Sequence, residues 1–491
     1  MNHKRCPLQC NKNHKLNRRD FLRGSTLVLA GSSFLTGCAS LSRKKTVMAP
    51  IQPPGPASKY VPKIKAAFVR RKEDYGMWWP GAVWDGKAAR RKYSAQMLET
   101  ADAIKINLDL RPEPIYSPAE ADSWCAEAKD ANVDGLIVMV HDRQQHAWPT
   151  AQKAVATGIP TVIFSPLGTS FTSNTILLAD TPGCVIYSTD DFSQAAYGMK
   201  MLKAGAKIRH TRCLVLKGSK RLDSSMADLG IELRYVPAKD FLDEYRNTPD
   251  TDRILAMADQ YIRQARRQRG ATRQDVINGI KSYLVAGNIL EREQCDAITM
   301  DCLGALGPTK ISLPCIAWSR MNDDGIPAAC EADLGAVAAH TIVQYLFDRP
   351  GFQQDPVADT LYDAIIGAHC SCPTRLNGFD KPPEPFDIVH HHGNRDAIPR
   401  TLWRKGRRVT SLDVFPGDQN RKTKLLISAG SVLDNIDVPP SGGCVVSVRI
   451  KFDGDYPVLS FPGFHQIFFY GDYKQHLVEF CQLFNLTAQV V

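Results

Sequence analysis

The sequence lacks several patterns that would assign it to a class of protein at once. After residue 10 it has no Cys-x-x-Cys pair, although it contains 14 cysteines, and no internal repeat is visible. Cysteines scattered through 491 residues do not form the dense framework of a small disulfide-bonded domain. We therefore expect mostly buried thiols rather than disulfides or zinc at the cysteine positions.

The sequence also lacks a strong excess of positive charge once its first residues are set aside. The formal net charge is +10, but residues 1–37 hold seven basic residues against Asp20 alone and contribute +6 of it. The remaining +4 gives no electrostatic reason to expect a nucleic-acid partner. The composition, with 44% hydrophobic and 23% charged residues, is that of a globular protein, and the length allows two to four domains.

The N-terminus has the features of an export signal. "NRRDFLRG" precedes a short apolar stretch, "STLVLAGSSFL", which is too short to cross a bilayer. Together they resemble a twin-arginine signal, and the following "LTGC" resembles a lipobox that ends at Cys38. We expect a signal at 1–37, lipidation of Cys38 and a flexible tether at 38–60. The implied location is periplasmic, anchored to the membrane by lipid alone; a disordered basic tail is the alternative.

Residues 61–330 have the alternating texture of an α/β protein. Apolar strands at 63–69, 105–110, 133–140 and 160–165 are separated by helical stretches, one of which has a capping box at Ser117. This order predicts a parallel sheet with right-handed crossovers in a first domain, 61–175. A second α/β domain, 176–330, is expected to contain the strands "CVIYS", "RCLVLKG" and "CDAITM".

The last part of the chain, 331–491, reads as a mostly β, barrel-like domain. One helix is expected near 330–347, strands with hairpin-like spacing dominate after about residue 380, and "YKQHLVEFCQLF" closes the chain as a helix. Two Rossmann-like parallel α/β domains followed by this β-rich domain form the fold class that the sequence predicts.

The run "IVHHHGN" raises the question of a site. Neighbouring side chains on a strand point to opposite faces, so His390 and His392 would share one face and His391 the other. Partners can come from "ACEADLGAV", where Glu331 and Asp333 open a helix, and from "GFHQIFFYGDY", where His465 begins a strand. Acids at a helix start, or a single strand histidine, are also common for structural reasons alone.

These stretches together resemble the L-fucose isomerase and L-arabinose isomerase superfamily, closely over 328–491 and loosely before it. The resemblance implies that Asp333 and His465, with His391, hold Mn²⁺ or another divalent cation. The side chains of Asp333 and His465 are then expected within roughly 5 Å of each other, and His391 is expected to face the same cleft. It implies aldose–ketose isomerisation, an intramolecular oxidation and reduction, through an ene-diol on the cation. Glu331 would be one of two catalytic acids.

The sequence departs from that pattern at the second acid. The family places it about two dozen residues before the metal-binding aspartate, where "LGPTK" has no carboxylate, and Asp301 is the nearest candidate. Without it, the chain would be a non-catalytic sugar- or polyol-binding lipoprotein that retains the fold. The resemblance also implies a homo-oligomer, a trimer or hexamer.

Substrate contacts are expected from aromatic and polar side chains. Trp78, Trp79 and Trp84 follow the first strand, where open α/β sheets hold ligands, and can stack on a sugar or pack a subunit interface. His392 would form a wall of the pocket. In "HCSC", His369, Cys370 and Cys372 have chelate-like spacing without a second half, so we expect a structural role there.

Overall fold

The structure is a computed structural model that describes residues 50–73, 85–142, 147–391, 395–418, 420–437 and 444–491. Cys38, Trp78, Trp79, Trp84 and His392 lie outside the described residues, as does the expected signal at 1–37. Among the described helices, none combines the length and the apolar character that a membrane crossing requires.

The first sheet contains five parallel strands in the order β2-β1-β3-β4-β5. The strands are β1 (Lys63–Val69), β2 (Asn107–Leu110), β3 (Gly135–Val140), β4 (Thr161–Ser165) and β5 (Cys184–Ser188). The helices of this part are α2 (Gly86–Ile104), α3 (Pro118–Asp130), α4 (Ala147–Ala156), α5 (Thr172–Thr175) and α6 (Phe192–Arg209). Every residue of β3 is buried, as its continuous apolar run predicts.

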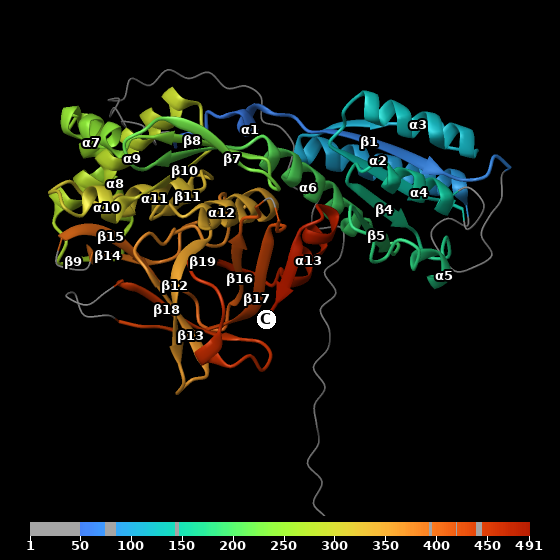
Figure 1. Cartoon of the computed structure of the whole chain (residues 1–491). Helices are drawn as coiled ribbons and strands as arrows, with labels where there is room; N and C mark the ends of the chain where they lie inside the picture. Colours follow the sequence, from blue (N-terminus) through green and yellow to red (C-terminus); the bar gives the residue numbers. More distant parts are fainter. Residues whose placement is uncertain (1–49, 74–84, 143–146, 392–394, 419, 438–443) are drawn as a thin grey trace, which may run out of the picture. The chain divides into compact units, whose positions relative to one another are not determined.

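Both faces of this sheet are covered by helices (Figure 1). Ala67 and Val69 of β1 belong to a core shared with α3 and α4, whereas Ala66 and Phe68 belong to a core shared with α2 and α6. Successive strand residues point to opposite faces, which is why two adjacent residues enter two different cores.

The expected boundary between the two α/β domains at 175/176 assigned "CVIYS" to the wrong sheet. This strand, β5, pairs in parallel with β4, so it is the last strand of the first sheet. The two sheets are joined instead through α6, which follows β5. An apolar strand pattern does not indicate which of two α/β sheets the strand joins.

The second sheet has the order β11-β10-β6-β8-β7, with β7 antiparallel to β8 and the other pairs parallel. Its strands are β6 (Arg212–Leu216), β7 (Leu222–Met226), β8 (Ile231–Val236), β10 (Ala297–Met300) and β11 (Ala328–Cys330). The helices of this part are α7 (Ala238–Asn247), α8 (Asp252–Gln264), α9 (Arg273–Glu293), α10 (Cys302–Leu306) and α11 (Cys315–Asp323).

The segment before β1 is not a free tether over residues 50–60. It contains the short helix α1 (Pro56–Lys59), and the backbone N–H groups of Ala57 and Ser58 donate to the buried carboxylate of Asp296 at 3.1 and 2.9 Å. A Pro- and Ser-rich composition does not distinguish a flexible linker from a docked one. Docking of this segment depends on its hydrogen bonds to Asp296, which lies far away in the sequence.

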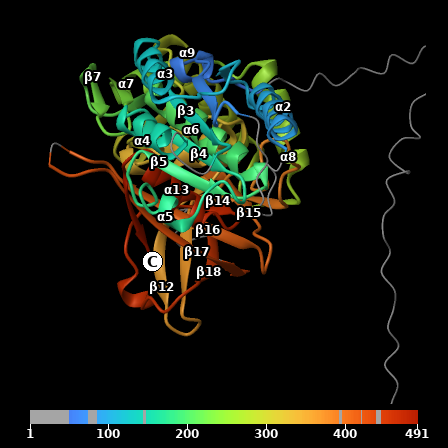
Figure 2. The same ribbon diagram turned by 90° about the vertical axis from the view of Figure 1, so that its right-hand side faces the viewer.

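The C-terminal part contains a closed antiparallel barrel of six strands in the order β16-β19-β12-β13-β18-β17, which the pairing of β16 with β17 closes. The strands are β12 (Phe352–Asp359), β13 (Ala364–His369), β16 (Arg408–Phe415), β17 (Lys424–Asn435), β18 (Val446–Phe452) and β19 (Gln466–Tyr470). Figure 2 shows β12, β16, β17 and β18 gathered in this barrel. The last strand, β20 (Thr487–Val490), adds to β17 in parallel.

Three further elements complete this part. Helix α12 (Leu334–Phe347) packs against β16 and β19, and α13 (Lys474–Leu483) packs against β17 and β20. A separate small sheet has the order β15-β14-β9, formed by β9 (Arg267–Arg269), β14 (Phe386–His391) and β15 (Arg395–Thr401). The α/β character and the β-rich C-terminal part are therefore as the sequence predicts, and the barrel is closed.

Candidate metal and catalytic site

Two acids follow the last strand of the second sheet. Glu331 comes directly after β11, and Asp333 is the N-cap of α12, where its Oδ1 accepts the Ala336 N–H at 2.8 Å. Glu331 and Ala332 have φ values of +64° and +53°. Both are non-glycine residues in the left-handed region, which is unusual and costs free energy. The Ala332 N–H, which donates to the Met300 carbonyl at 2.8 Å, helps to hold this turn.

A third residue with left-handed backbone, His465, faces them from the barrel. Its φ is +53°, and it lies immediately before β19. The carboxylate of Asp413 accepts the N–H of the preceding Phe464 at 3.0 Å, which fixes the chain at this point. Strained residues persist where surrounding contacts over-determine them and are frequent at functional sites. The gathering of three such residues is therefore a reason to place a site here.

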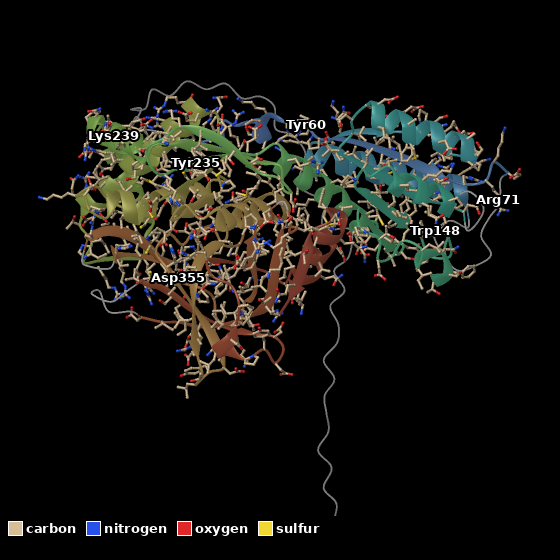
Figure 3. All side chains as sticks on the ribbon, viewed as in Figure 1. Tyr60, Arg71, Trp148, Tyr235, Lys239 and Asp355 are labelled. Carbon is tan, nitrogen blue, oxygen red and sulfur yellow. The ribbon has the colours of Figure 1, made fainter. Side chains whose placement is uncertain are left out.

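The pairing of barrel strands brings a further acid beside His465. Gln354 of β12 is opposite Gln466 of β19 in an antiparallel pair, so the next residue of β12, Asp355, comes next to His465. Asp355 Oδ1 lies 3.2 Å from His465 Nε2, and Glu331 Oε2 lies 3.5 Å from the same nitrogen. Figure 3 labels Asp355 on the barrel. One imidazole nitrogen thus faces two carboxylates from two different parts of the fold.

The other nitrogen of His465 contacts Asp333. Its Nδ1 lies 2.8 Å from Asp333 Oδ2, so the predicted proximity of Asp333 and His465 is confirmed. The position of Asp333 behind the ring nevertheless differs from that of a ligand. A carboxylate that holds one imidazole nitrogen orients the other nitrogen toward a metal. Asp333 therefore has the geometry of a residue that positions His465.

The group of atoms around His465 Nε2 fits a divalent cation. His465 Nε2 and Asp355 Oδ1 are both buried atoms and lie 3.2 Å apart, so the protonated imidazole pairs with this carboxylate when no ion is bound. Two ligands at right angles around an ion such as Mn²⁺ are separated by about 3 Å. Carboxylate oxygens with one imidazole nitrogen are a donor set that suits manganese. The residues that would hold the ion are therefore Glu331, His369 and His465, whose ligand atoms all lie within 4.8 Å of one another, together with Asp355 beside His465 Nε2.

The electrostatics of the cluster support the same conclusion. Burial lowers the pKa of His465, but the hydrogen bonds to Asp333 and Asp355 and the charges of these two carboxylates outweigh it and raise the pKa to about 10. A protonated imidazole thus offsets the surrounding carboxylates where a cation would otherwise do so. The pKa of Glu331 is raised, first by burial and also by the charges of Asp355, Asp333 and Asp301, against the lowering effect of His465.

His369, at the end of β13, is a further candidate ligand. Its Nε2 lies 3.8 Å from Glu331 Oε1, and its side chain is buried. Burial lowers its pKa to about 4 despite the nearby charge of Asp355, so this contact is not an ion pair at neutral pH. A neutral imidazole is the form that binds a metal. Sequence analysis favoured a structural role for His369; the geometry places it at the cluster.

Asp301, the expected second catalytic acid, lies at the edge of this cluster. It follows β10, the neighbour of β11, and its carboxylate caps α10 by accepting the Gly304 N–H at 3.1 Å. Its charge is one of those that raise the pKa of Glu331. The acid that shares the ion-binding atoms with Glu331 is instead Asp355, which sequence analysis missed.

A signal for Asp355 was present in the sequence. Glu331 precedes Asp355 by about two dozen residues, which is the spacing expected between the two acids of the family that the chain resembles. With Asp333 taken as the metal-binding aspartate, the same spacing leads to "LGPTK", which has no carboxylate.

His391 and His390 have different surroundings. His391 is buried, and its Nε2 lies 2.9 Å from Cys370 Sγ, whereas His390 Nε2 lies 3.6 Å from Asp275 on α9. The opposite orientation expected for these two neighbours is therefore confirmed. His391, expected to be a ligand beside Asp333 and His465, groups instead with Cys370 and Cys315. His369 and Cys370 are consecutive, and their side chains point to two different clusters.

A cavity of about 730 Å³, lined among others by Lys63, Pro160 and Gly183, lies elsewhere. These residues mark the amino ends of β1, β4 and β5, whereas open parallel sheets hold ligands at the carboxyl ends of their strands. Glu331 and Asp301 follow the carboxyl ends of β11 and β10. We therefore place the candidate site at the carboxylate cluster and not at the 730 Å³ cavity.

Comparisons with known proteins do not assign the chain to a family. No family model and no curated protein matches it. Among solved structures, it has a weak similarity to the solute-binding protein of an ABC transporter from Burkholderia multivorans, with a TM-score of 0.17 and 11% identity, covering 49% of this chain and 80% of that one. A similarity at this level carries no conclusion about fold or function.

Proposed function

We propose that the protein is a metal-dependent isomerase that interconverts an aldose and a ketose, related to the L-fucose and L-arabinose isomerases. The observation that carries the proposal is the convergence of Glu331 and Asp355 on Nε2 of His465, with Asp333 behind the ring. A closed β-barrel joined to parallel α/β sheets, and acids about two dozen residues apart, support the relationship.

The chain's own residues provide the two functions that this reaction needs. A divalent cation such as Mn²⁺, when bound, would polarise the sugar carbonyl and so acidify the neighbouring C–H. The pKa of Glu331 is raised toward neutral pH, which suits a general base, and this carboxylate is placed to take a proton from one carbon. Asp355 approaches from the barrel and is the second carboxylate, placed to return a proton to the adjacent carbon. Two acids are needed because the proton leaves one carbon and arrives at another.

The exposure of the acids agrees with a site that admits a small polar substrate. The side chains of Glu331, Asp333 and Asp355 are each about one-third exposed, whereas His465 is 6% exposed. The carboxylates are therefore reachable by a sugar or polyol while the imidazole remains fixed. The proposal includes export by the twin-arginine route, a lipid anchor at Cys38 and assembly into a homo-oligomer.

The test is isomerisation by the purified full chain in deuterated buffer, with Mn²⁺, Mg²⁺ or Co²⁺ and a panel of aldoses and ketoses. Proton transfer through an ene-diol exchanges the transferred proton with solvent, so deuterium is expected on the product carbon, read by NMR. Asp355→Asn is expected to abolish product formation. Asp359→Asn is the matched control, because Asp359 lies on the same strand but pairs with Arg449 at 2.8 Å.

Sugar binding without turnover, across the panel and with each cation, would contradict the isomerase and favour the non-catalytic lipoprotein. Product formation that Asp355→Asn leaves unchanged would move the chemistry away from this cluster. Both results can be read with the same samples, because calorimetric binding and NMR turnover use the same protein and sugars.

A further inference from the structure

Three thiols and one imidazole meet beside the carboxylate site. Cys370 Sγ lies 2.9 Å from His391 Nε2 and 3.8 Å from Cys444 Sγ. One ligand atom from each of Cys315, Cys370 and His391 lies within 4.8 Å of the other two, and all three residues are buried. Cys444 is only partly buried, which leaves access to the group from solvent.

These four residues come from four separate segments. Cys315 begins α11, Cys370 follows β13, His391 ends β14, and Cys444 precedes β18. The pairing of β14 with β15 shifts register between His390 and His391, an irregularity of the kind that re-aims side chains. A buried thiol that only fills space needs no other sulfur and no imidazole nearby. Convergence from four segments requires a different explanation.

The distance between Cys370 and Cys444 is that of neighbouring ligands in a tetrahedral metal site. With Zn–S near 2.3 Å and Zn–N near 2.0 Å, adjacent ligand atoms are separated by roughly 3.5–3.8 Å. The separation of Cys370 from Cys444 agrees with this value. The shorter contact of Cys370 with His391 is that of a hydrogen bond, and it would lengthen by roughly half an ångström when an ion replaces the shared proton.

We propose that Cys315, Cys370, Cys444 and His391 bind a structural zinc ion. Three sulfurs with one imidazole select zinc over the hard cations that oxygen ligands prefer. Four protein ligands leave no open position for a substrate, so this ion fastens α11, β13, β14 and β18 together and takes no part in the reaction. Cys372 is not a ligand, because its thiol is directed to the Pro373 carbonyl at 3.4 Å.

The first test is the zinc content of the full chain purified without added metal. One zinc per chain is expected for the wild type, for Asp355→Asn and for Cys125→Ser, whose cysteine is buried in the first α/β part. Cys370→Ser and Cys444→Ser are expected to lose it. Because Asp355→Asn retains zinc, the failure of this proposal and the failure of the isomerase proposal are distinguishable.

A second measurement covers the case in which Cys370→Ser does not fold. Exchange of the wild-type ion for Co²⁺ is expected to give the intense visible bands of a tetrahedral site and near-ultraviolet charge transfer from thiolate. Cys444→Ser, at the accessible position, is expected to lose both the visible bands and the charge transfer while the protein remains folded. A wild type with neither zinc nor a cobalt spectrum of this kind, or a disulfide between Cys370 and Cys444 found by non-reducing peptide mass mapping, would overturn the proposal.

Discussion

Two consecutive residues, His369 and Cys370, belong to two different clusters: the carboxylate site and the thiol cluster of Cys315, Cys370, Cys444 and His391. The two clusters offer opposite kinds of ligand. His369 approaches Glu331 at 3.8 Å, and the next residue, Cys370, contacts His391 at 2.9 Å. The acids Glu331, Asp333 and Asp355 are each about one-third exposed, whereas Cys315, Cys370 and His391 are buried. Oxygen ligands open to solvent suit a reaction centre, and enclosed sulfur ligands suit a structural centre.

This difference predicts that the two clusters can be disabled separately. A large loss, like that expected for Asp355→Asn, is expected for Glu331→Gln, which would remove a carboxylate from the ion and from proton transfer. We expect turnover to fall roughly 10²–10⁴-fold, the usual contribution of a general acid or base. Zinc content, measured on the same sample by elemental analysis, should not change. Loss of both zinc and turnover would show that the clusters are one site.

A smaller effect is expected where a residue acts through another. Asp333→Asn removes the charge behind His465 but retains an N-cap for α12, since Asn caps helices about as well as Asp. Loss of such an outer partner lowers metal affinity by about 10–100-fold. Titration of Mn²⁺ by calorimetry would show this, with unchanged thermal stability as the control. An unchanged Mn²⁺ affinity would exclude a positioning role.

The sequence predicted the periodic parts of this molecule better than its contacts. The strands expected to dominate after about residue 380 are present as β14, β16, β17, β18 and β19, because alternating apolar residues are a local signal. The docking of residues 50–60 on Asp296, the closure of the barrel and the assignment of β5 depend on partners distant in the chain. No local pattern contains that information.

The candidate site divides in the same way. Asp333 and His465 were predicted to meet because both belong to stretches that resemble one family, and they do meet. Asp355 was missed because Asp333 was taken as the metal-binding aspartate, although the pairing of β12 with β19 brings Asp355 to His465. His391 was predicted to join the carboxylates, but it groups with thiols from other segments. The residue types identified the kind of chemistry, and the strand register decided which side chains take part.

The charge of His465 makes the stability of the metal-free protein depend on pH. Its pKa is about 10 in the folded chain against an ordinary value of 6.5. The imidazolium therefore stabilises the fold fully below about pH 6.5, and this contribution is lost as pH rises toward 10. Thermal melts between pH 6.5 and 10 without added cation should show a falling Tm. His465→Gln should flatten that fall, and an equal slope in both proteins would contradict the assignment.

The smallest effect is expected for Asp301, which lies near Glu331 without sharing its ion-binding atoms. Asp301→Asn retains the cap of α10 and removes one charge that raises the pKa of Glu331. We expect a change of about 1 kcal/mol or less, which is under tenfold in turnover. Its pH–rate profile should shift to lower pH. A loss as large as that of Glu331→Gln would restore Asp301 as the second catalytic acid.

The geometry of the carboxylate site is tested most directly by locating the ion. Crystals of the full chain soaked in Mn²⁺ would show it by anomalous scattering. The expected result is one ion roughly 2.0–2.3 Å from His465 Nε2 and from carboxylate oxygens of Glu331 and Asp355, with Asp333 still bonded to His465 Nδ1. An ion ligated by Asp333 or Asp301 in place of Asp355, or no ion at this cluster, would contradict it.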